Sequence, residues 1–305
     1  MKTIYYFLLL FVLSFAHTSI FAQAPEIVQQ PESEAKCVGE STQFKVLASG
    51  EEPFQYQWYF EGNAVGTNSS VLEINDISNA DNGFYYCEVS NAQGSVDSEM
   101  AMLVVVENAP TINSFSNDQT LCQGEQMQLD VDVTAEIASY QWFKQGVENY
   151  VHYGQTYTIA NTSIDDAGVY YCKVSNVCGL VSTDSIYVDI ISLPSFVSMP
   201  QSTTICEGED LTFTMEVSGD DIAYKWLANG DEIVGETASS LVLENISYPH
   251  SIIYTPIAYN SCAQIQGLNL SVNVKSIPHI TGNPISQSDC GEVEITLYAT
   301  ATSNS

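Results

Sequence analysis

The cysteine thiol is the side chain in this sequence that can take part in the most kinds of chemistry. The chain has eight cysteines, and a thiolate can attack a substrate, bind a metal or join a disulfide. Nucleophilic catalysis also needs an activating base. Beyond the N-terminal segment, His152, His250 and His279 stand alone in different stretches, and no HExxH, GxSxG, CxxC or glycine-rich phosphate loop occurs. We therefore predict no catalytic residue and no cofactor, and we interpret the cysteines as structural.

Paired acidic residues are the other candidates for chemistry, because calcium binds carboxylate oxygens. A calcium site needs about six to eight oxygens that converge at about 2.4 Å. No loop has the DxDxDG spacing, and Asp165-Asp166 suits a turn. We therefore predict no metal site at any of the acidic pairs, which are Glu51-Glu52, Asp165-Asp166, Asp220-Asp221 and Asp231-Glu232.

The charge of the chain argues against two classes of partner. Its formal net charge is −30, and all seven basic residues are lysines. Nucleic-acid binding and docking to anionic lipid both need clustered cations, so we expect neither. We expect instead a protein or glycan ligand outside the cell. Tyrosines near predicted loops could stack on a sugar or on a protein partner, namely Tyr150, Tyr153 and Tyr157.

The first 24 residues have the features of a secretory signal peptide. Lys2 supplies the positive start, residues 4–16 are apolar with one exception, and residues 22–24 offer a small-x-small cleavage pattern. The apolar run is too short for a membrane span, which needs about 20 residues. We predict that residues 1–24 direct a secreted or cell-surface chain, with no direct membrane insertion in this fragment. In that oxidising compartment disulfides persist.

A repeat of about 84 residues is the strongest pattern in the sequence. A Cys-x-Gly-Glu opening recurs at Cys37, Cys122 and Cys206, and Cys290-Gly-Glu resembles it. Short runs of alternating apolar and polar residues, separated by clusters of Asn, Gly, Ser and Asp, predict short strands joined by turns. Three repeats also carry a tryptophan in matching context, at Trp58, Trp142 and Trp226.

The repeat predicts an all-β chain of tandem domains. A proline follows the last strand-like run of each repeat, as a junction residue would. The expected domains are residues 25–107, 108–191, 192–275 and 276–305, of which the third is degenerate and the fourth is the start of a truncated domain.

Two repeats contain the motif Asp-x-Gly-x-Tyr-x-Cys, which ends at Cys87 and at Cys172, and each motif is followed by Asn-x-x-Gly. These motifs resemble the turn into strand F and the F–G hairpin of the immunoglobulin superfamily. The resemblance implies tandem immunoglobulin-like antiparallel β-sandwiches with a core tryptophan and a tyrosine corner. The core residues that it implies are Trp58, Trp142, Trp226, Tyr85, Tyr170 and Tyr254.

The third repeat departs from this motif. It keeps Tyr254, but His250 and Ile252 replace the Asp and the Gly, and Pro256 replaces the strand-F cysteine. Proline has no backbone donor, so we expect a bulge or weakened strand pairing at Pro256.

More narrowly, the Cys-x-Gly-Glu opening and a later Asn-x-Cys-Gly resemble immunoglobulin-like repeats of large secreted bacterial cell-surface proteins. That resemblance implies an extracellular array for adhesion or binding and for spacing, without catalysis. Two alternatives remain open. The chain could be a non-catalytic module of a larger secreted enzyme, or the ectodomain of a signalling receptor.

The cysteines do not follow the usual pattern of the family. There the strand-B cysteine lies about a dozen residues before the tryptophan, at the positions held here by Val46, Val131 and Met215. Cys37 and its counterparts lie nine residues further upstream, at the expected turn into strand B. Nine extended residues span roughly 30 Å, whereas disulfide Cα atoms lie within about 7 Å. A bond from Cys37 to the mid-strand Cys87 would therefore be strained.

Cys178 and Cys262 align with each other in the F–G hairpins of successive repeats, at the end where the chain enters a sandwich. We therefore hypothesise disulfides across the junctions, Cys37–Cys178 and Cys122–Cys262, with the strand-F cysteines left as buried thiols. Such a link would restrict hinge motion at a small interface. The alternative, bonds within domains, joins Cys37 to Cys87 and Cys122 to Cys172.

Overall fold

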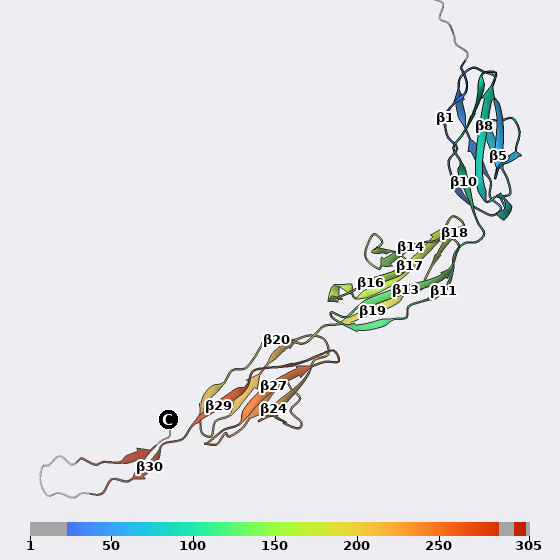
Figure 1. Ribbon diagram of the computed structural model, residues 1–305. Helices are drawn as coiled ribbons and strands as arrows, with labels where there is room; N and C mark the ends of the chain where they lie inside the picture. Colours follow the sequence, from blue (N-terminus) through green and yellow to red (C-terminus); the bar gives the residue numbers. More distant parts are fainter. Residues whose placement is uncertain (1–22, 287–295, 303–305) are drawn as a thin grey trace, which may run out of the picture. The chain divides into compact units, whose positions relative to one another are not determined.

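The computed structural model describes residues 23–286 and 296–302 (Figure 1). Almost all of the predicted signal peptide, and much of the predicted fourth domain, lie outside the described residues. The described part consists of β-strands with two short 3-10 turns. In that part, no helix is long and apolar enough to cross a membrane.

The first sandwich comprises β1 to β10. Its larger sheet has the order β2-β10-β8-β5-β6, with β9 beside β8, and the pairs β1–β4 and β3–β7 complete it. Apolar residues from these sheets share one core. The elements are β1 (Glu26–Gln29), β2 (Glu34–Cys37), β3 (Thr42–Lys45), β4 (Leu47–Ser49), β5 (Gln55–Phe60), β6 (Asn63–Val65), β7 (Val71–Ile74), η1 (Asn79–Asp81), β8 (Gly83–Asn91), β9 (Gly94–Asp97) and β10 (Ala101–Val106).

The second sandwich comprises β11 to β19 and repeats this plan. One sheet has the order β12-β19-β17-β14-β15, with β18 beside β17, and the other has the order β11-β13-β16. The elements are β11 (Thr111–Phe115), β12 (Gln119–Cys122), β13 (Met127–Thr134), β14 (Ser139–Lys144), β15 (His152–Tyr153), β16 (Thr156–Ile159), η2 (Ile164–Asp166), β17 (Gly168–Asn176), β18 (Gly179–Ser182) and β19 (Ile186–Ile191).

The third sandwich comprises β20 to β29, and a further strand pair follows it. The larger sheet has the order β21-β29-β27-β24-β25, with β28 beside β27, and the remaining pairs are β20–β23, β22–β26 and β30–β31. The elements are β20 (Ser195–Ser198), β21 (Thr203–Cys206), β22 (Leu211–Thr214), β23 (Glu216–Ser218), β24 (Ala223–Ala228), β25 (Asp231–Glu232), β26 (Ser240–Leu243), β27 (Ile253–Tyr259), β28 (Gln264–Gln266), β29 (Leu270–Lys275), β30 (His279–Gly282) and β31 (Thr300–Thr302).

One strand pair in each sandwich is parallel rather than antiparallel, and it fixes the position of the Cys-x-Gly-Glu cysteine. The strand that ends in this cysteine runs beside the last strand of the sandwich. The cysteine therefore lies next to the residue at which the chain leaves the sheet. The final partners of the three ladders are Cys37 with Val106, Cys122 with Ile191, and Cys206 with Lys275.

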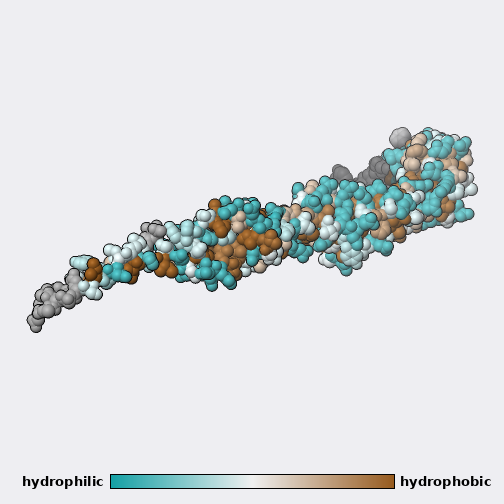
Figure 2. Space-filling model, turned by 90° about the horizontal axis from the view of Figure 1, so that it is seen from below, coloured by the Kyte–Doolittle hydropathy of each residue, from teal (hydrophilic) through white to brown (hydrophobic). Residues whose placement is uncertain are grey.

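Each sandwich buries one tryptophan completely. Trp58, Trp142 and Trp226 are 0% exposed, and each indole N–H donates to a backbone carbonyl 2.9 to 3.0 Å away. This bond satisfies the one polar atom of a large apolar ring, as burial requires. On the face shown in Figure 2, hydrophobic residues reach the surface only in patches between hydrophilic ones.

The motif tyrosines are also buried, and their hydroxyls close a corner in two of the sandwiches. In the third sandwich, where the motif aspartate is missing, the Tyr254 hydroxyl instead lies 3.3 Å from Nε2 of His250. Burial is the main cause that raises the pKa of Tyr85 to about 12 and that raises the pKa of Tyr170. The two corner bonds run from Tyr85 Oη to Asp81 O, at 2.9 Å, and from Tyr170 Oη to Asp166 O, at 2.6 Å.

The bulge expected at Pro256 is not found, because the ladder between β24 and β27 runs without a shift and sets Pro256 opposite Trp226. The corresponding amide of Cys87 points away from this ladder and donates to the Ser98 hydroxyl at 2.9 Å. A proline at this position therefore costs a bond to a side chain and leaves the ladder intact. In the third sandwich Gly267 takes the serine's place and still donates its own amide to Pro256 O at 2.8 Å.

Grouping by spatial contacts divides the chain into two compact units. The first runs to Asn113 and includes residues 132–140 and 173–182, and the second holds the remainder. The hairpin of β17 and β18 thus groups with the first sandwich, although its strands belong to the sheet of the second. This first unit contains both Cys37 and Cys178.

Candidate functional site: the disulfide-linked turns and hairpins

The Cys-x-Gly-Glu motif folds as a tight turn that its own glutamate holds closed. The amide of Cys37 donates to Glu40 Oε2 at 2.7 Å, and the amide of Glu40 donates back to Cys37 O at 3.1 Å. Gly39 has a φ of 85°, a left-handed conformation in which a Cβ would be strained. Its amide donates to Ile77 O at 2.8 Å, and Ile77 donates to Glu40 O at 2.9 Å. The motif therefore encodes a rigid mount for the cysteine.

The same turn occurs three times in the described residues. In each copy the cysteine amide reaches the glutamate carboxylate, and the glycine adopts a left-handed φ of 85 to 90°. The residue after the cysteine donates to the last strand of the sandwich, so the turn is fastened to the exit of the chain. The carboxylate bonds are Cys37 to Glu40 at 2.7 Å, Cys122 to Glu125 at 2.8 Å and Cys206 to Glu209 at 2.8 Å.

An asparagine that recurs in the hairpins of the repeats is the second part of the site. Oδ1 of Asn176 accepts the amides of Cys178 and Gly179 at 2.9 and 3.1 Å, which fixes the hairpin. Its Nδ2 donates to Asn108 O at 2.8 Å, which ties the hairpin to the segment that follows β10. Asn260 repeats these bonds, with Nδ2 donating to Ser192 O at 2.8 Å.

A disulfide joins the first turn to the hairpin of the next repeat. The sulfurs of Cys37 and Cys178 lie 2.04 Å apart, with a Cα–Cα distance of 5.1 Å and a sequence separation of 141 residues. Sγ of Cys178 also lies 3.3 Å from Val106 O, which ends β10. The bond therefore closes over the segment at which the chain leaves the first sandwich.

A second disulfide repeats the first one. Cys122 and Cys262 are joined with an S–S distance of 1.95 Å, a Cα–Cα distance of 5.6 Å and a sequence separation of 140 residues. Beside it, Asp220 Oδ2 accepts both the amide and the hydroxyl of Ser192, at 2.8 and 2.6 Å. These two bonds lower the pKa of the Asp220 carboxyl. Asp220, a member of the acidic pair Asp220-Asp221, thus uses its carboxylate to hold the linker at Ser192.

The bonds within domains are not formed in the structure. Neither Cys87 nor Cys172 takes part in a disulfide. Both side chains are 0% exposed, and Cys87 lies directly opposite Trp58 in the core. Burial is the main cause that raises the pKa of Cys87 to about 12 and that of Cys172 to about 11. A thiol held protonated in this way is a poor nucleophile. Cys206, on the third turn, is a free and exposed thiol.

No group of three or more His, Cys, Asp or Glu side chains suitable for a metal ion occurs within residues 23–286 and 296–302. Asp166 completes a capping box with Ser163, accepting its amide and hydroxyl at 2.7 and 2.8 Å. The local sequence thus explains the Asp165-Asp166 pair through the turn.

The tyrosines singled out in the second repeat divide into two groups. Tyr150 and Tyr153 are 42% and 54% exposed and place their ring centroids 4.1 Å apart. Tyr157 instead stacks on His152 at 4.9 Å, beside the core tyrosine of that sandwich. Exposure therefore leaves Tyr150 and Tyr153 able to contact a ligand.

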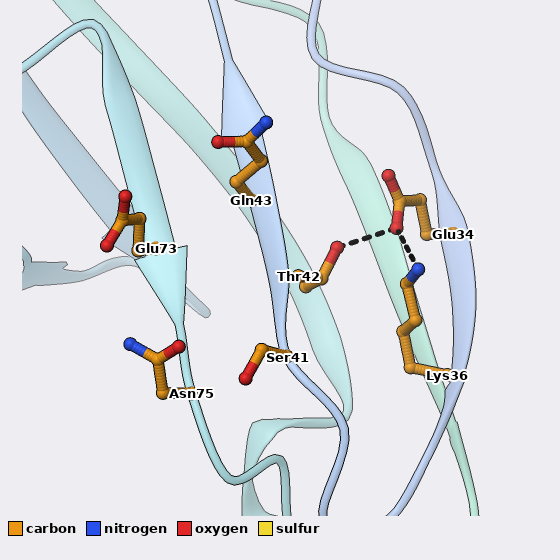
Figure 3. Close-up of a pocket in the computed structure, with 7 residues that line it drawn as sticks. All are labelled: Glu34, Lys36, Ser41, Thr42, Gln43, Glu73 and Asn75. Atoms are coloured by element: carbon orange, nitrogen blue, oxygen red, sulfur yellow. Dashed lines mark hydrogen bonds and ion pairs between the residues drawn. The ribbon is translucent and has the colours of Figure 1, made fainter.

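A shallow depression of about 480 Å³ lies on the first sandwich, between β2, β3 and β7 (Figure 3). Three of the residues that line it are paired with one another. Thr42 Oγ1 donates to Glu34 Oε2 at 2.6 Å, and Lys36 Nζ lies 3.2 Å from the same oxygen. The Thr42 bond and, after it, Lys36 lower the pKa of Glu34. The β2 side of the depression therefore presents polar groups that are already paired with one another.

Comparisons with known proteins agree with the fold. The family model for the immunoglobulin domain matches residues 24–91 and 109–176. A solved structure of titin domains I67–I69, an E-to-A mutated variant, is similar with a TM-score of 0.51, at 19% identity, over 83% of this chain and 99% of that chain. The chain carries tandem immunoglobulin-like domains. The predicted fold class is thereby confirmed.

Curated relatives of these immunoglobulin-like domains are animal proteins. The muscle M-line assembly protein unc-89 of Caenorhabditis elegans is 26% identical over 283 residues, which cover 79% of this chain and 3% of that protein. Neuroglian of Drosophila melanogaster is 36% identical over 87 residues, which cover 28% of this chain and 7% of that protein. The chain spans only a small part of these relatives. The comparisons give no support to the narrower resemblance to bacterial surface repeats.

Sequence reasoning missed the roles of the motif glutamate and the hairpin asparagine. Both were visible as recurring letters, but a recurring Glu or Asn does not reveal which backbone amide it bonds. The signal available was their fixed distance from a cysteine in every repeat.

Proposed function

We propose that the chain is part of an extracellular array of immunoglobulin-like domains in which disulfides between consecutive domains restrict the hinges. The array would serve adhesion or binding, and spacing, at a cell surface. One observation carries the proposal: the same turn and the same hairpin form a disulfide twice, each time over the linker between two sandwiches. A linker held by two chain segments and a covalent bond has far fewer accessible conformations than a single free strand.

The domain boundaries that we propose are residues 25–107, 108–191 and 192–275, with a fourth domain starting at 276. The grouping of strands into sheets supports them, since no described sheet combines strands from two of these ranges. A signal peptide at residues 1–24 would deliver the chain to an oxidising compartment, where its disulfides persist.

Secretion is tested by expressing the chain with its first 24 residues and sequencing the protein recovered from the medium. We expect a start near Gln23 or Pro25. Non-reducing peptide maps should then link Cys37 to Cys178 and Cys122 to Cys262. Retention in the cytoplasm with reduced cysteines would contradict the extracellular assignment, and a Cys37–Cys87 peptide would contradict the hinge mechanism.

Hinge restriction is tested by backbone ¹⁵N relaxation on the full chain. With the disulfide intact, the first two sandwiches should report one common correlation time. In the double variant C37S/C178S the two values should separate, because the linker is then free to bend. C206S serves as the matched control and should leave the relaxation unchanged. Equal values in the double variant would show that the disulfide does not limit the hinge.

Binding is tested with beads that carry the chain and with cells treated beforehand by protease or by glycosidases. We expect attachment that one of the two treatments abolishes, which separates a protein ligand from a glycan ligand. Attachment that survives both treatments, or none to any cell type, would contradict the adhesion role and leave spacing alone.

A further inference from the structure

The outer face of the larger sheet in the first sandwich carries two stacked tyrosines. Tyr59 on β5 and Tyr86 on β8 are direct cross-strand partners, with ring centroids 4.8 Å apart and ring planes 11° apart. Trp58 and Cys87, their chain neighbours, point into the core, so the alternation of a strand turns the two tyrosines outward. Both rings are half-buried, which leaves part of each open to solvent.

Two carboxylates lie on the same face beside these rings. Glu88 is two residues from Tyr86 and so shares its side of the strand, and Asp97 on β9 is the direct partner of Glu88. The Tyr59 hydroxyl donates to Glu88 Oε2 at 3.3 Å and holds that carboxylate next to the stack. We name Tyr59, Tyr86, Glu88 and Asp97 together the tyrosine–acid face.

The carboxylates of this face are an unfavourable pair in the isolated chain. Like charges directly opposite each other on neighbouring strands destabilise a sheet. The ion pair seen within the described residues joins Lys36 to Glu34 on β2. The chain contains no arginine and carries a net charge of −30. A cation supplied by a partner would relieve this repulsion.

The other two sandwiches do not repeat this combination of charge and rings. The second sandwich keeps a stacked pair, Phe143 and Tyr171, with centroids 5.2 Å apart. At the positions of Glu88 and Asp97, however, it places Lys173 opposite Ser182. The third sandwich has Ile257 opposite Gln266 there. The fold therefore tolerates a lysine or an apolar residue at this position, and the sheet does not require the paired acids of the first sandwich.

We propose that the tyrosine–acid face docks an arginine or lysine side chain of a basic protein partner. The cation lies over the Tyr59–Tyr86 rings, whose faces attract positive charge, and its N–H groups donate to Glu88 and Asp97. Charge complementarity selects this occupant, because the face offers acceptors and π-electron density and no donor beyond the tyrosine hydroxyls. The inference rests on the proposed binding function and names the chemistry of its partner.

The test uses the ¹⁵N-labelled full chain at low salt and a capped Gly-Arg-Gly peptide as probe. We expect saturable shifts of the amides of the tyrosine–acid face, and no comparable shifts with capped Gly-Glu-Gly. E88K copies the residue found in the second sandwich, so it should fold, and it should weaken binding at least about tenfold. E88Q, which keeps the shape of the side chain, should also weaken it.

A control variant with the same change in charge distinguishes docking at the tyrosine–acid face from general attraction of the peptide to an acidic chain. E73K alters an exposed carboxylate on β7, outside the larger sheet, and should leave the affinity of the tyrosine–acid face unchanged. If E73K and E88K weakened binding of the peptide equally, the proposal would be overturned. Amide shifts beside acidic residues throughout the chain would overturn it as well. So would full affinity in Y86L, because the rings would then contribute nothing. Any of these results would leave the disulfide-linked array intact, since relaxation and peptide mapping test it separately.

Discussion

In the first two sandwiches the strand position opposite the core tryptophan carries a buried cysteine, and in the third it carries Pro256. The neighbouring residue, which accepts a hydrogen bond from the cysteine amide in the first two sandwiches, also differs in the third. The amides of Cys87 and Cys172 donate to the hydroxyls of Ser98 and Thr183, whereas Gly267 takes that place beside Pro256. Two residues that share one hydrogen bond have thus changed together, and the third sandwich keeps its sheet and its core.

The comparison also covers the thiols. The first two sandwiches each hold a buried thiol and a bonded turn cysteine, whereas the third holds no core thiol and an exposed Cys206. Burial thus protects the core thiols from reagents in solution. The disulfides leave the first two turn cysteines without a thiol that could react. Among the turns that the structure describes, the third keeps an accessible thiol.

The largest effect that we expect is a difference in thiol reactivity between these sandwiches. In the native chain at pH 8, Cys206 should react readily with a disulfide reagent. Cys87 and Cys172 should react slower by about three orders of magnitude, because they are reached only when the sandwich opens. Timed labelling followed by peptide mass analysis measures this. Rapid labelling of Cys87 in the folded chain would show that the core is open to solvent.

Removal of a disulfide should have the next largest effect. C37S/C178S should lower the free energy of unfolding by about 2–4 kcal/mol, since the link constrains the unfolded chain. Urea denaturation measures the loss. C206S is the control and should change stability by less than about 0.5 kcal/mol, as an exposed substitution does. A loss of similar size in C206S would mean that the third turn is not free.

A serine in place of Gly267 tests the paired substitution directly. A Cβ at this position would lie 2.6 Å from Cγ of Pro256, so G267S should destabilise the third sandwich by about 1–3 kcal/mol. The double variant P256C/G267S rebuilds the arrangement of the first sandwich and should recover most of the loss, as a double-mutant cycle would show. If the double variant is as unstable as the sum of the two single ones, the residues are not coupled.

The smallest difference concerns the tyrosine hydroxyls. Y85F removes a bond to the backbone carbonyl of Asp81 and should cost about 1 kcal/mol. Y254F removes a longer contact with a partly exposed histidine and should cost less. Thermal unfolding of the two variants in parallel provides the measurement. Equal costs would show that the corner bond to Asp81 has no special weight.

Local patterns and motifs were enough to predict the all-β class and the buried aromatic residues of the core. Strand alternation and turn residues are short-range signals, because side chains of a strand point to opposite faces with a period of two. The burial of the repeated tryptophans and of the motif tyrosines was predicted from the resemblance to the immunoglobulin superfamily, which places a tryptophan in the core and a tyrosine at a corner. Trp58 and Tyr85 lie in the core.

The outcome at Pro256 shows why the rest could not be predicted in the same way. The cost of a proline depends on where the lost amide would have pointed, and the sequence does not give that direction. The structure shows that the amide faces a side chain rather than the ladder, and that Gly267 has replaced that side chain. The partner lies eleven residues away along the chain, and no local pattern connects the two.

The sequence by itself determined the repeat, the spacing of its cysteines and the excess of negative charge, because these are properties of composition and order. The tertiary structure decided between the two sets of disulfides that the sequence left open, since a parallel strand pair places Cys37 at the exit of one sandwich, and Asn176 holds the next hairpin against the linker. It also decided that Glu88 and Asp97 share a face with two stacked tyrosines. Both outcomes depend on strand register, which brings residues far apart in sequence to within bonding distance.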